Sequence, residues 1–152
     1  MSESVVLTIA IANSLALISV GGGLYEFVVI DPVWPCRPDL IQPNRGGISR
    51  KRFWIPAHTT FELVLIAALV MAWSLADARF WLLVALISHA VMRAWSLVDF
   101  VPKALAFERA DPATIPESAA RSWTRRSFWR LPLDIVTCAS MLTAFAAAML
   151  AC

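Results

Sequence analysis

The sequence predicts an all-α integral membrane protein, a bundle of four membrane-spanning helices. Of its 152 residues, 59% are hydrophobic and only 16% are charged, whereas a soluble domain is closer to half apolar and a quarter charged. Four apolar segments are long enough to cross a hydrocarbon core of about 30 Å as helices. We therefore expect one domain over residues 1–152, with spans at about 5–30, 53–75, 80–101 and 128–151.

The first span carries three glycines, Gly21 to Gly23, in its second half. In a membrane helix such a triplet allows close backbone approach or a kink. Asp31-Pro32 ends the span, because proline cannot continue the helical hydrogen-bond ladder. A loop with Asn44-Arg45-Gly46-Gly47, a turn signal, comes next.

The second span opens with Phe53-Trp54-Ile55-Pro56, directly after the basic run from Arg50 to Arg52. A very short turn at Asp77 to Arg79 makes the second and third spans antiparallel neighbours. The stretch from Asp99 to Pro102 is expected to end the third span, since proline stops a helix.

The fourth span has an alanine-rich end, around Ala144 to Ala148, that suits tight helix packing. In the polar loop before it, Ser118 to Arg126 is expected to form an amphipathic helix at the membrane interface. The dipeptide Phe128-Trp129 repeats Phe53-Trp54, and each pair precedes a proline. A parallel repeat of a two-helix unit and a chance similarity of interfacial aromatics both explain this echo.

Charge gives the orientation. Nearly all of the 13 Lys and Arg residues lie in or beside the two long loops, so both loops are expected in the cytoplasm and both termini outside. The net charge of +2 is too small to suggest nucleic acid as a partner. Cys36, Cys138 and Cys152 lack the spacing of a disulfide framework or a thiolate metal site. Residues 1–3 carry no basic side chain, which argues against a secretory signal peptide.

Ionisable residues occur inside all four apolar spans, and the order of the spans places them in one leaflet. Such residues are costly in a bilayer and are usually functional. The candidate catalytic residues are Glu26, Glu62, His89, Arg93 and Asp134, and the candidate cofactor ligand is His58. Tyr25, Trp54 and Trp95 are candidates for the wall of a substrate pocket.

Three chemistries are open for this set. His58 and Glu62 lie four residues apart on one helix face and, with His89, could hold a single divalent metal. A haem needs one axial histidine, for which His58 is the candidate. Without a cofactor, Glu26, Glu62 and His89 would act as acids and bases, and Arg93 would stabilise a developing oxyanion.

Structural explanations exist for several of these residues. Arg130 could reach outward to lipid headgroups, and Asp134 could pair with Arg130 four residues away. Glu26 and Arg93 could form an ion pair that only holds the bundle together. Several such residues from four helices at one depth nevertheless favour a functional site.

Short motifs resemble a family of small four-span bacterial membrane proteins that is grouped with the anthrone oxygenase-like proteins. The resemblance implies a bacterial inner (cell) membrane location and the oxidation of polycyclic phenolic anthrones to quinones. It rests on Leu24-Tyr25-Glu26, Pro32, Trp34, Phe53 to Pro56 with His58, Phe100-Val101-Pro102 and residues 123–134.

Ala57-His58 and Ala94-Trp95 carry a second resemblance. It is to styrene oxide isomerase, a four-span membrane enzyme. It implies a trimer that binds haem b through a histidine early in the second span, here His58. Glu62, His89 and Arg93 have no clear counterpart, so haem is an implication of the likeness alone.

From the residues and the resemblances together, we expect a homo-oligomeric enzyme in the lipid bilayer. It would oxidise or isomerise a small lipophilic molecule that enters from the bilayer. A small-molecule transporter or binding protein with a proton relay is the alternative, and a structural membrane subunit is another.

Overall fold

The computed structural model describes residues 3–151, so the expectations about the first two residues and Cys152 lie outside the described part. Four long apolar helices dominate, and no strand occurs in residues 3–151, which confirms the predicted all-α fold class. They are α1 (Glu3–Tyr25), α2 (Lys51–Met71), α3 (Ala76–Trp95) and α6 (Leu131–Leu150).

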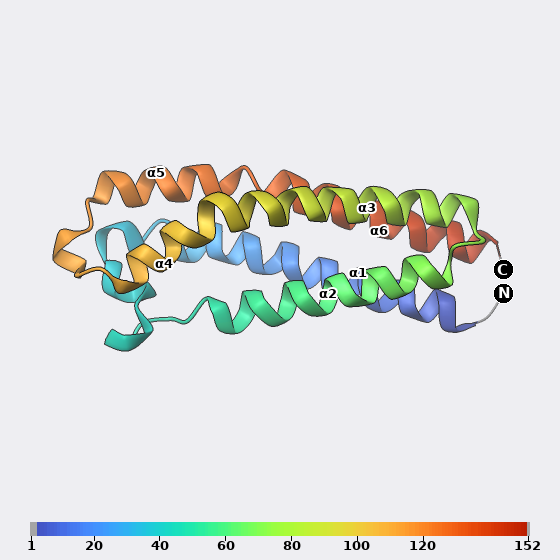
Figure 1. Ribbon diagram of the computed structural model, residues 1–152, viewed down its shortest axis with the longest axis horizontal. Coiled ribbons are helices and arrows are strands. Elements are labelled where there is room, and N and C mark those ends of the chain that lie inside the picture. Colours follow the sequence, from blue (N-terminus) through green and yellow to red (C-terminus); the bar gives the residue numbers. More distant parts are fainter. Residues whose placement is uncertain (1–2, 152) are drawn as a thin grey trace.

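The four helices lie along the long axis of the molecule (Figure 1). The start of α1, the end of α6 and the turn between α2 and α3 share one end, and the long loops lie at the other. Ile9, Phe61, Leu65, Leu82 and Met141 meet in the core between the helices.

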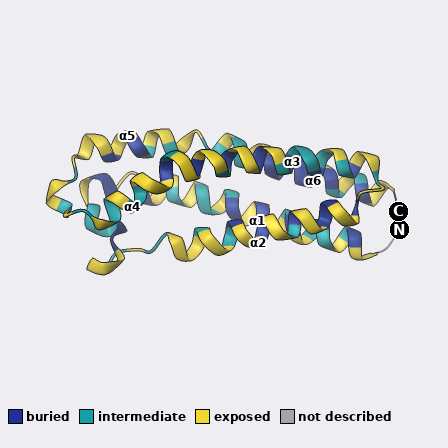
Figure 2. Cartoon of the chain, viewed as in Figure 1, coloured by how far each residue is buried: buried dark blue, intermediate teal, exposed yellow. Residues whose placement is uncertain are grey.

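Broad stretches of the helices are exposed (Figure 2), and many of the exposed residues are large and apolar. Val70 on α2 is 68% exposed, and Leu7 on α1 is 61% exposed. Each of the four helical segments is long and apolar enough to cross a membrane. These outward faces suit contact with lipid, since a bilayer solvates apolar surface.

Two π-helical turns mark corresponding places in the chain. α1 continues into η1 (Glu26–Ile30), and α3 continues into η5 (Ser96–Phe100). A proline stands two residues after each turn, at Pro32 and Pro102. This shared pattern favours the interpretation that the chain repeats a two-helix unit.

The third span does not end at Pro102, in contrast to the expectation from the sequence. It runs on into α4 (Val101–Arg109), where Pro102 occupies the first turn. Proline is tolerated there because the first backbone N–H groups of a helix have no partner within it. The turn between the second and third spans also differs, lying at residues 72–75 rather than at Asp77 to Arg79.

The loops fold into a cap over one end of the bundle. The first loop forms three short 3₁₀ turns, η2 (Trp34–Cys36), η3 (Pro38–Ile41) and η4 (Pro43–Arg45). The second forms α4, η6 (Pro112–Thr114) and α5 (Glu117–Phe128), the helix expected near Ser118 to Arg126. A second apolar cluster joins the two loops through Trp34, Ile41, Phe100, Ala120 and Trp123.

Gln42 ties the cap together. It is almost fully buried, and its Nε2 donates hydrogen bonds of 2.8 Å to the carbonyl oxygens of Phe107 and Ala110. A break at residues 129–130 separates α5 from α6, so α6 begins about three residues later than the expected start at 128.

Candidate functional site

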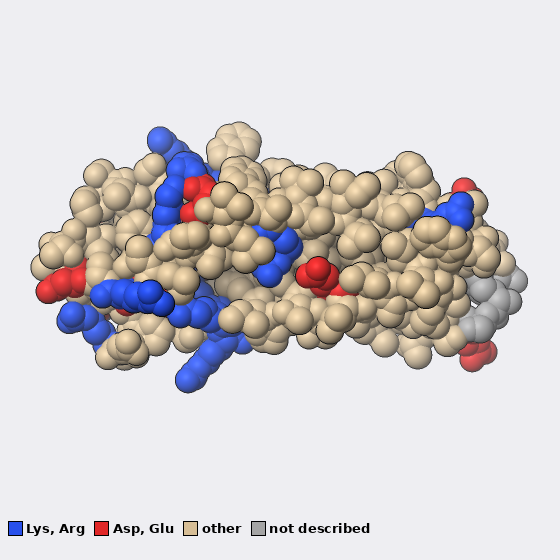
Figure 3. Space-filling view, viewed as in Figure 1, with Lys and Arg blue, Asp and Glu red and all other residues tan. Residues whose placement is uncertain are grey.

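A cavity of about 410 Å³ lies where the bundle meets the loop cap. This volume is within the range of small-molecule sites. All four spans and both loops line it, including His58 of α2 and Leu131 of α6. Figure 3 shows Lys, Arg, Asp and Glu side chains gathered mainly over this end of the molecule. The charged residues on its wall are Glu26, Asp31, Arg50, Lys51, Arg93, Glu108, Arg130 and Asp134.

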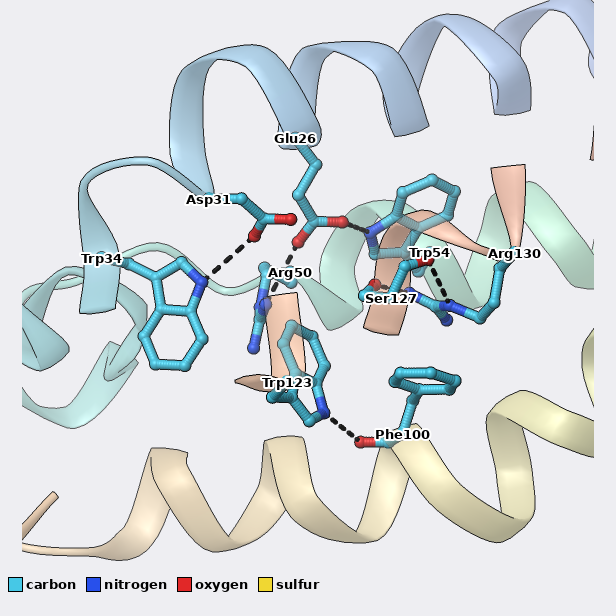
Figure 4. Close-up of polar contacts among 9 residues, drawn as sticks. All are labelled: Glu26, Asp31, Trp34, Arg50, Trp54, Phe100, Trp123, Ser127 and Arg130. Atoms are coloured by element: carbon cyan, nitrogen blue, oxygen red, sulfur yellow. Dashed lines mark hydrogen bonds and ion pairs between the residues drawn. The ribbon is translucent and has the colours of Figure 1, made fainter. Parts of the chain in front are cut away.

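Glu26 stands at the first position of η1 and is held by two donors (Figure 4). Its Oε1 accepts a hydrogen bond from Arg50 Nη1 at 3.2 Å, and its Oε2 accepts one from Trp54 Nε1 at 2.9 Å. The Arg50 side chain is only 10% exposed and lies over the rings of Trp123 and Trp34, at 5.0 and 5.7 Å. The pair therefore fixes the start of α2 against η1 and the cap.

Asp31 is a second carboxylate at this end, just beyond the first span. It accepts a hydrogen bond from Trp34 Nε1 at 3.1 Å. Burial raises the pKa of Asp31 to about 6, and the nearby charge of Glu26 adds to the rise. The Trp34 hydrogen bond and the charges of Arg50 and Arg130 oppose it.

Arg130 turns into the cavity, so the interpretation that it reaches outward to headgroups is wrong. Its Nη1 donates to Ser96 Oγ at 3.0 Å, and its Nη2 donates to Ser127 Oγ. Its guanidinium lies 4.4 Å from the centre of the Phe100 ring. Trp123 Nε1 donates to the carbonyl oxygen of Phe100, so Phe100 joins α5 to η5 (Figure 4).

Arg93 and Asp134 face the same cavity without touching. Neither side chain forms a hydrogen bond or an ion pair with another described residue. Counted from the end shared by Ala76 and Leu150, Arg93 lies about 26 Å along α3 and Asp134 about 24 Å along α6, at a rise of 1.5 Å per residue. Opposite charges from two packed helices thus stand at one depth, apart from each other. The pairs expected for them, Asp134 with Arg130 and Glu26 with Arg93, are not formed.

The two histidines form a buried pair. His58 stacks on Trp54, with ring centres 5.1 Å apart and planes 17° apart, and its ring centre lies 5.6 Å from that of His89. The edge of Phe61 packs against His89. His58 lines the cavity, whereas His89 lies outside its lining. His58 Nδ1 and His89 Nε2 are buried without a hydrogen-bond partner.

Three predicted site residues lie away from the cavity. Glu62 is exposed on the outer surface of α2, Tyr25 is 60% exposed, and Trp95 is 37% exposed. Successive helical residues turn by about 100°, so a helix that aims Glu26 at the cavity turns Tyr25 away. Trp95 packs against the ring of Phe100 instead, with centres 5.5 Å apart.

The predicted metal set of His58, Glu62 and His89 is not assembled. Within residues 3–151, no group of three or more His, Cys, Asp or Glu side chains lies close enough to hold a metal ion. The reason is that Glu62 points outward while both histidines point inward. For a haem, the structure offers one histidine on the cavity wall, His58, with an unpartnered Nδ1. Haem binding therefore stays a prediction.

Several residues of this site do not stand out in the sequence. By sequence, Arg50 and Arg130 are basic residues of the loops, and Trp123 is an aromatic residue of the membrane interface. Ser96 carries no signal by itself, yet it occupies in η5 the position that Glu26 occupies in η1. π-turns of this kind occur often at functional sites, and both open onto the cavity here.

Comparisons with protein-family models, with curated proteins and with solved structures find no match for this chain.

Proposed function

We propose that the chain is a membrane-embedded enzyme that isomerises a small lipophilic molecule by moving a proton. The observation that carries the proposal is the separated pair of Arg93 and Asp134 on the cavity wall. A guanidinium can bind the oxygen of a carbonyl, a phenol or an epoxide, and a carboxylate can take a proton from a neighbouring atom. The gap between the two groups is where such a molecule would lie.

The chemistry needs no electrons from elsewhere. The Asp134 carboxylate removes a proton from the carbon beside the carbonyl, and the electron pair of the C–H bond moves toward the oxygen. Arg93 hydrogen-bonds the resulting oxyanion, and Asp134 returns the proton to another atom of the same molecule. Phe27, Phe128 and Leu131 supply apolar walls that favour a lipophilic substrate.

Oxidation is the related reaction that the anthrone oxygenase-like resemblance implies. An anthrone that has lost this proton is an electron-rich phenolate-type anion, which dioxygen can oxidise to a quinone. Dioxygen would be the required co-reactant, with one oxygen atom forming the new carbonyl and the other leaving as water, and the same two residues would act in the first step.

The test is a substrate screen with variants. Purified protein in lipid nanodiscs is incubated in D₂O with lipophilic ketones, anthrones and aryl epoxides, and products and deuterium uptake are read by mass spectrometry. Asp134→Asn should lower turnover by about 10²- to 10⁴-fold, the usual contribution of a general acid–base group. Arg93→Gln should lower it too, because the oxyanion loses its donor.

The control is Arg79→Gln, at the far end of the bundle, where Arg79 Nη1 donates to the carbonyl oxygen of Trp73 at 2.8 Å. It should retain full turnover. Wild-type turnover in folded Asp134→Asn and Arg93→Gln proteins would remove both residues from the mechanism.

A proton-coupled transporter is the second candidate, favoured by the histidine pair. His58 touches the cavity and His89 lies beside it, so the two imidazoles could pass a proton between the cavity and the interior of the bundle. Proteoliposomes with a pH-sensitive dye inside would report ligand-driven proton uptake. Uptake that disappears in His89→Phe would favour transport over isomerisation.

A further inference from the structure

The side chain of Glu62 lies in the middle of a membrane span without a partner in the described chain. It is the twelfth of the 21 residues of α2, about 16 Å from the first of them at 1.5 Å per residue. It lies on the exposed surface of the helix, and its side chain forms no hydrogen bond or ion pair with any residue of the described chain. A carboxylate in the middle of a membrane span is disfavoured unless something pairs with it.

Arg93 is the matching cation. It is partly exposed, lies on α3, the other helix of this hairpin, and lacks an ion pair with any described residue. The histidine pair fixes its height relative to Glu62. Glu62 comes one helical turn after His58 and Arg93 one turn after His89, and the two helices run in opposite directions. Each is four residues from its histidine, so the two residues are about 12 Å apart along the bundle axis, one on either side of the histidines.

The side chains lean toward each other across that interval. In a helix the Cα–Cβ bond tilts toward the N-terminus, which for α2 is the loop end and for α3 is the opposite end. Long Glu and Arg side chains that lean in opposite directions can shorten the gap from both sides. A second copy that is related by rotation about the membrane normal has its residues at the same depths. Glu62 of one copy and Arg93 of the other are therefore separated along the axis by the same distance as within one chain.

The surface beside Arg93 also lets another helix approach. Ala90 and Ala94 are exposed one turn apart on α3, and such small residues allow close helix packing in membranes. The outer surface of α2 beside Glu62 offers the larger Leu63 and Ile66. Charge and size are thus complementary between the two surfaces.

We propose that a second copy of this chain covers this face, with Glu62 of one copy paired to Arg93 of the next. Within one chain Glu62 lies on the outer surface, Arg93 lines the cavity, and no ion pair joins them, whereas a second copy brings its own Glu62 to the same depth. The contact of α2 in one copy with α3 of the other forms a two-fold dimer when it is reciprocal, and a ring of copies when it is not and the rotation between copies closes. Each cavity is then completed by one residue of its neighbour, whatever reaction takes place inside.

Photo-crosslinking in native membranes tests the contact. A benzophenone side chain is placed at position 62 and, as a control, at position 70, which is equally outward-facing but two turns farther from Arg93. The probe at position 62 should give an adduct of twice the chain mass that contains the α3 segment around Arg93. The probe at position 70 should not capture that segment. Adducts within one chain, or to lipid alone, would overturn the proposal.

A charge exchange tests the pair itself. Native mass spectrometry of the detergent-solubilised protein should show that Glu62→Gln and Arg93→Gln each weaken association about three- to tenfold, the range for polar contacts between membrane helices. The double variant Glu62→Arg with Arg93→Glu should restore association. A wild-type protein that is monomeric under these conditions would contradict the proposal. So would a charge exchange that restores the thermal stability of a monomer, because the pair would then lie within one chain.

Discussion

Asp31 is the residue whose ionisation the fold opposes most clearly outside the spans. Its pKa rises from 3.8 to about 6 because it is buried, so the folded state binds its proton more tightly than the unfolded state. The stability that this gives is fully present below about pH 4 and is lost as the pH rises to about 6. Asp31→Asn keeps an oxygen for Trp34 Nε1 and should remove this loss.

Thermal unfolding in detergent at about pH 3 and about pH 7, each about one unit beyond these limits, measures the effect. The variant should be more stable than the wild type at the higher pH. Asp111→Asn is the control, because the exposed Asp111 caps η6 through an oxygen that asparagine retains. An equal pH dependence in wild type and Asp31→Asn would show that Asp31 is not the responsible group.

Arg50 is expected to matter far more than a typical loop arginine. Arg50→Met leaves the Glu26 carboxylate, 17% exposed, with only Trp54 as a donor. Removal of one partner from a buried pair costs about 3–5 kcal/mol. Arg37→Met breaks an exposed pair with Asp39 in the same loop and should cost about 0–1 kcal/mol. Unfolding free energies in mixed micelles compare the two, and similar losses would contradict the role given to Arg50.

The depth of the site residues could be predicted from the sequence, but their direction could not. Position along a span places Glu26, His58, Arg93 and Asp134 in one half of the bundle, where the structure has them lining one cavity. Hydropathy does not say which side of a uniformly apolar helix faces inward, because lipid and core favour the same side chains. For this reason the sequence could not show that Glu62 points outward.

At the scale of elements, Gly22 is the glycine of the triplet that lets α1 and α2 approach closely. A Cβ at Gly22 would collide with the ring of Phe53, whereas one at Gly21 meets nothing within 4 Å. The ring of Phe53 lies 4.9 Å from that of Trp54, which binds Glu26. Close approach of α1 and α2 at Gly22 therefore reaches the site.

Gly22→Val should accordingly destabilise the protein by about 1–3 kcal/mol, the usual cost of overpacking. Gly21→Val is the matched control and should change stability little. Unfolding free energies measure the difference, and indole fluorescence should report a disturbed Trp54 in the Gly22 variant alone. Equal stability of the two variants would show that Phe53 yields without cost.

The prolines show why the element boundaries were harder to predict. Pro32 and Pro102 both come after a π-turn, but the chain leaves the helix after η1 and continues into α4 after η5. The segment Lys103 to Arg109, directly after Pro102, has a composition that favours a helix, whereas Pro35, Pro38 and Pro43 interrupt the residues after Pro32. A proline therefore marks the end of one hydrogen-bond ladder without deciding whether another begins.

For the whole molecule, most of the charged side chains gather at one end and few lie at the opposite end (Figure 3), and charged residues of the first end line the cavity. The basic loops that form the cap also supply Arg50 and, beside the second loop, Arg130 to the cavity. If the loops face the cytoplasm, as the distribution of Lys and Arg indicates, the cavity lies in the cytoplasmic leaflet. Its ligand would then reach it from that leaflet or from the cytoplasm.

Cysteine labelling decides this orientation. Cys36 is exposed in the cap, beside Arg121 and Glu117, and Ser74 is exposed in the turn at the other end. Two variants are compared, with Cys138 and Cys152 replaced by alanine in both: one keeps Cys36, and the other carries Cys36→Ala with Ser74→Cys. A membrane-impermeant maleimide should label the Ser74→Cys protein in intact cells, but the Cys36 protein only after permeabilisation, because the positive-inside rule puts the cap on the cytoplasmic side. The reverse pattern would place the loops outside and the cavity in the outer leaflet, while the clustering of its charged residues at one end would stand.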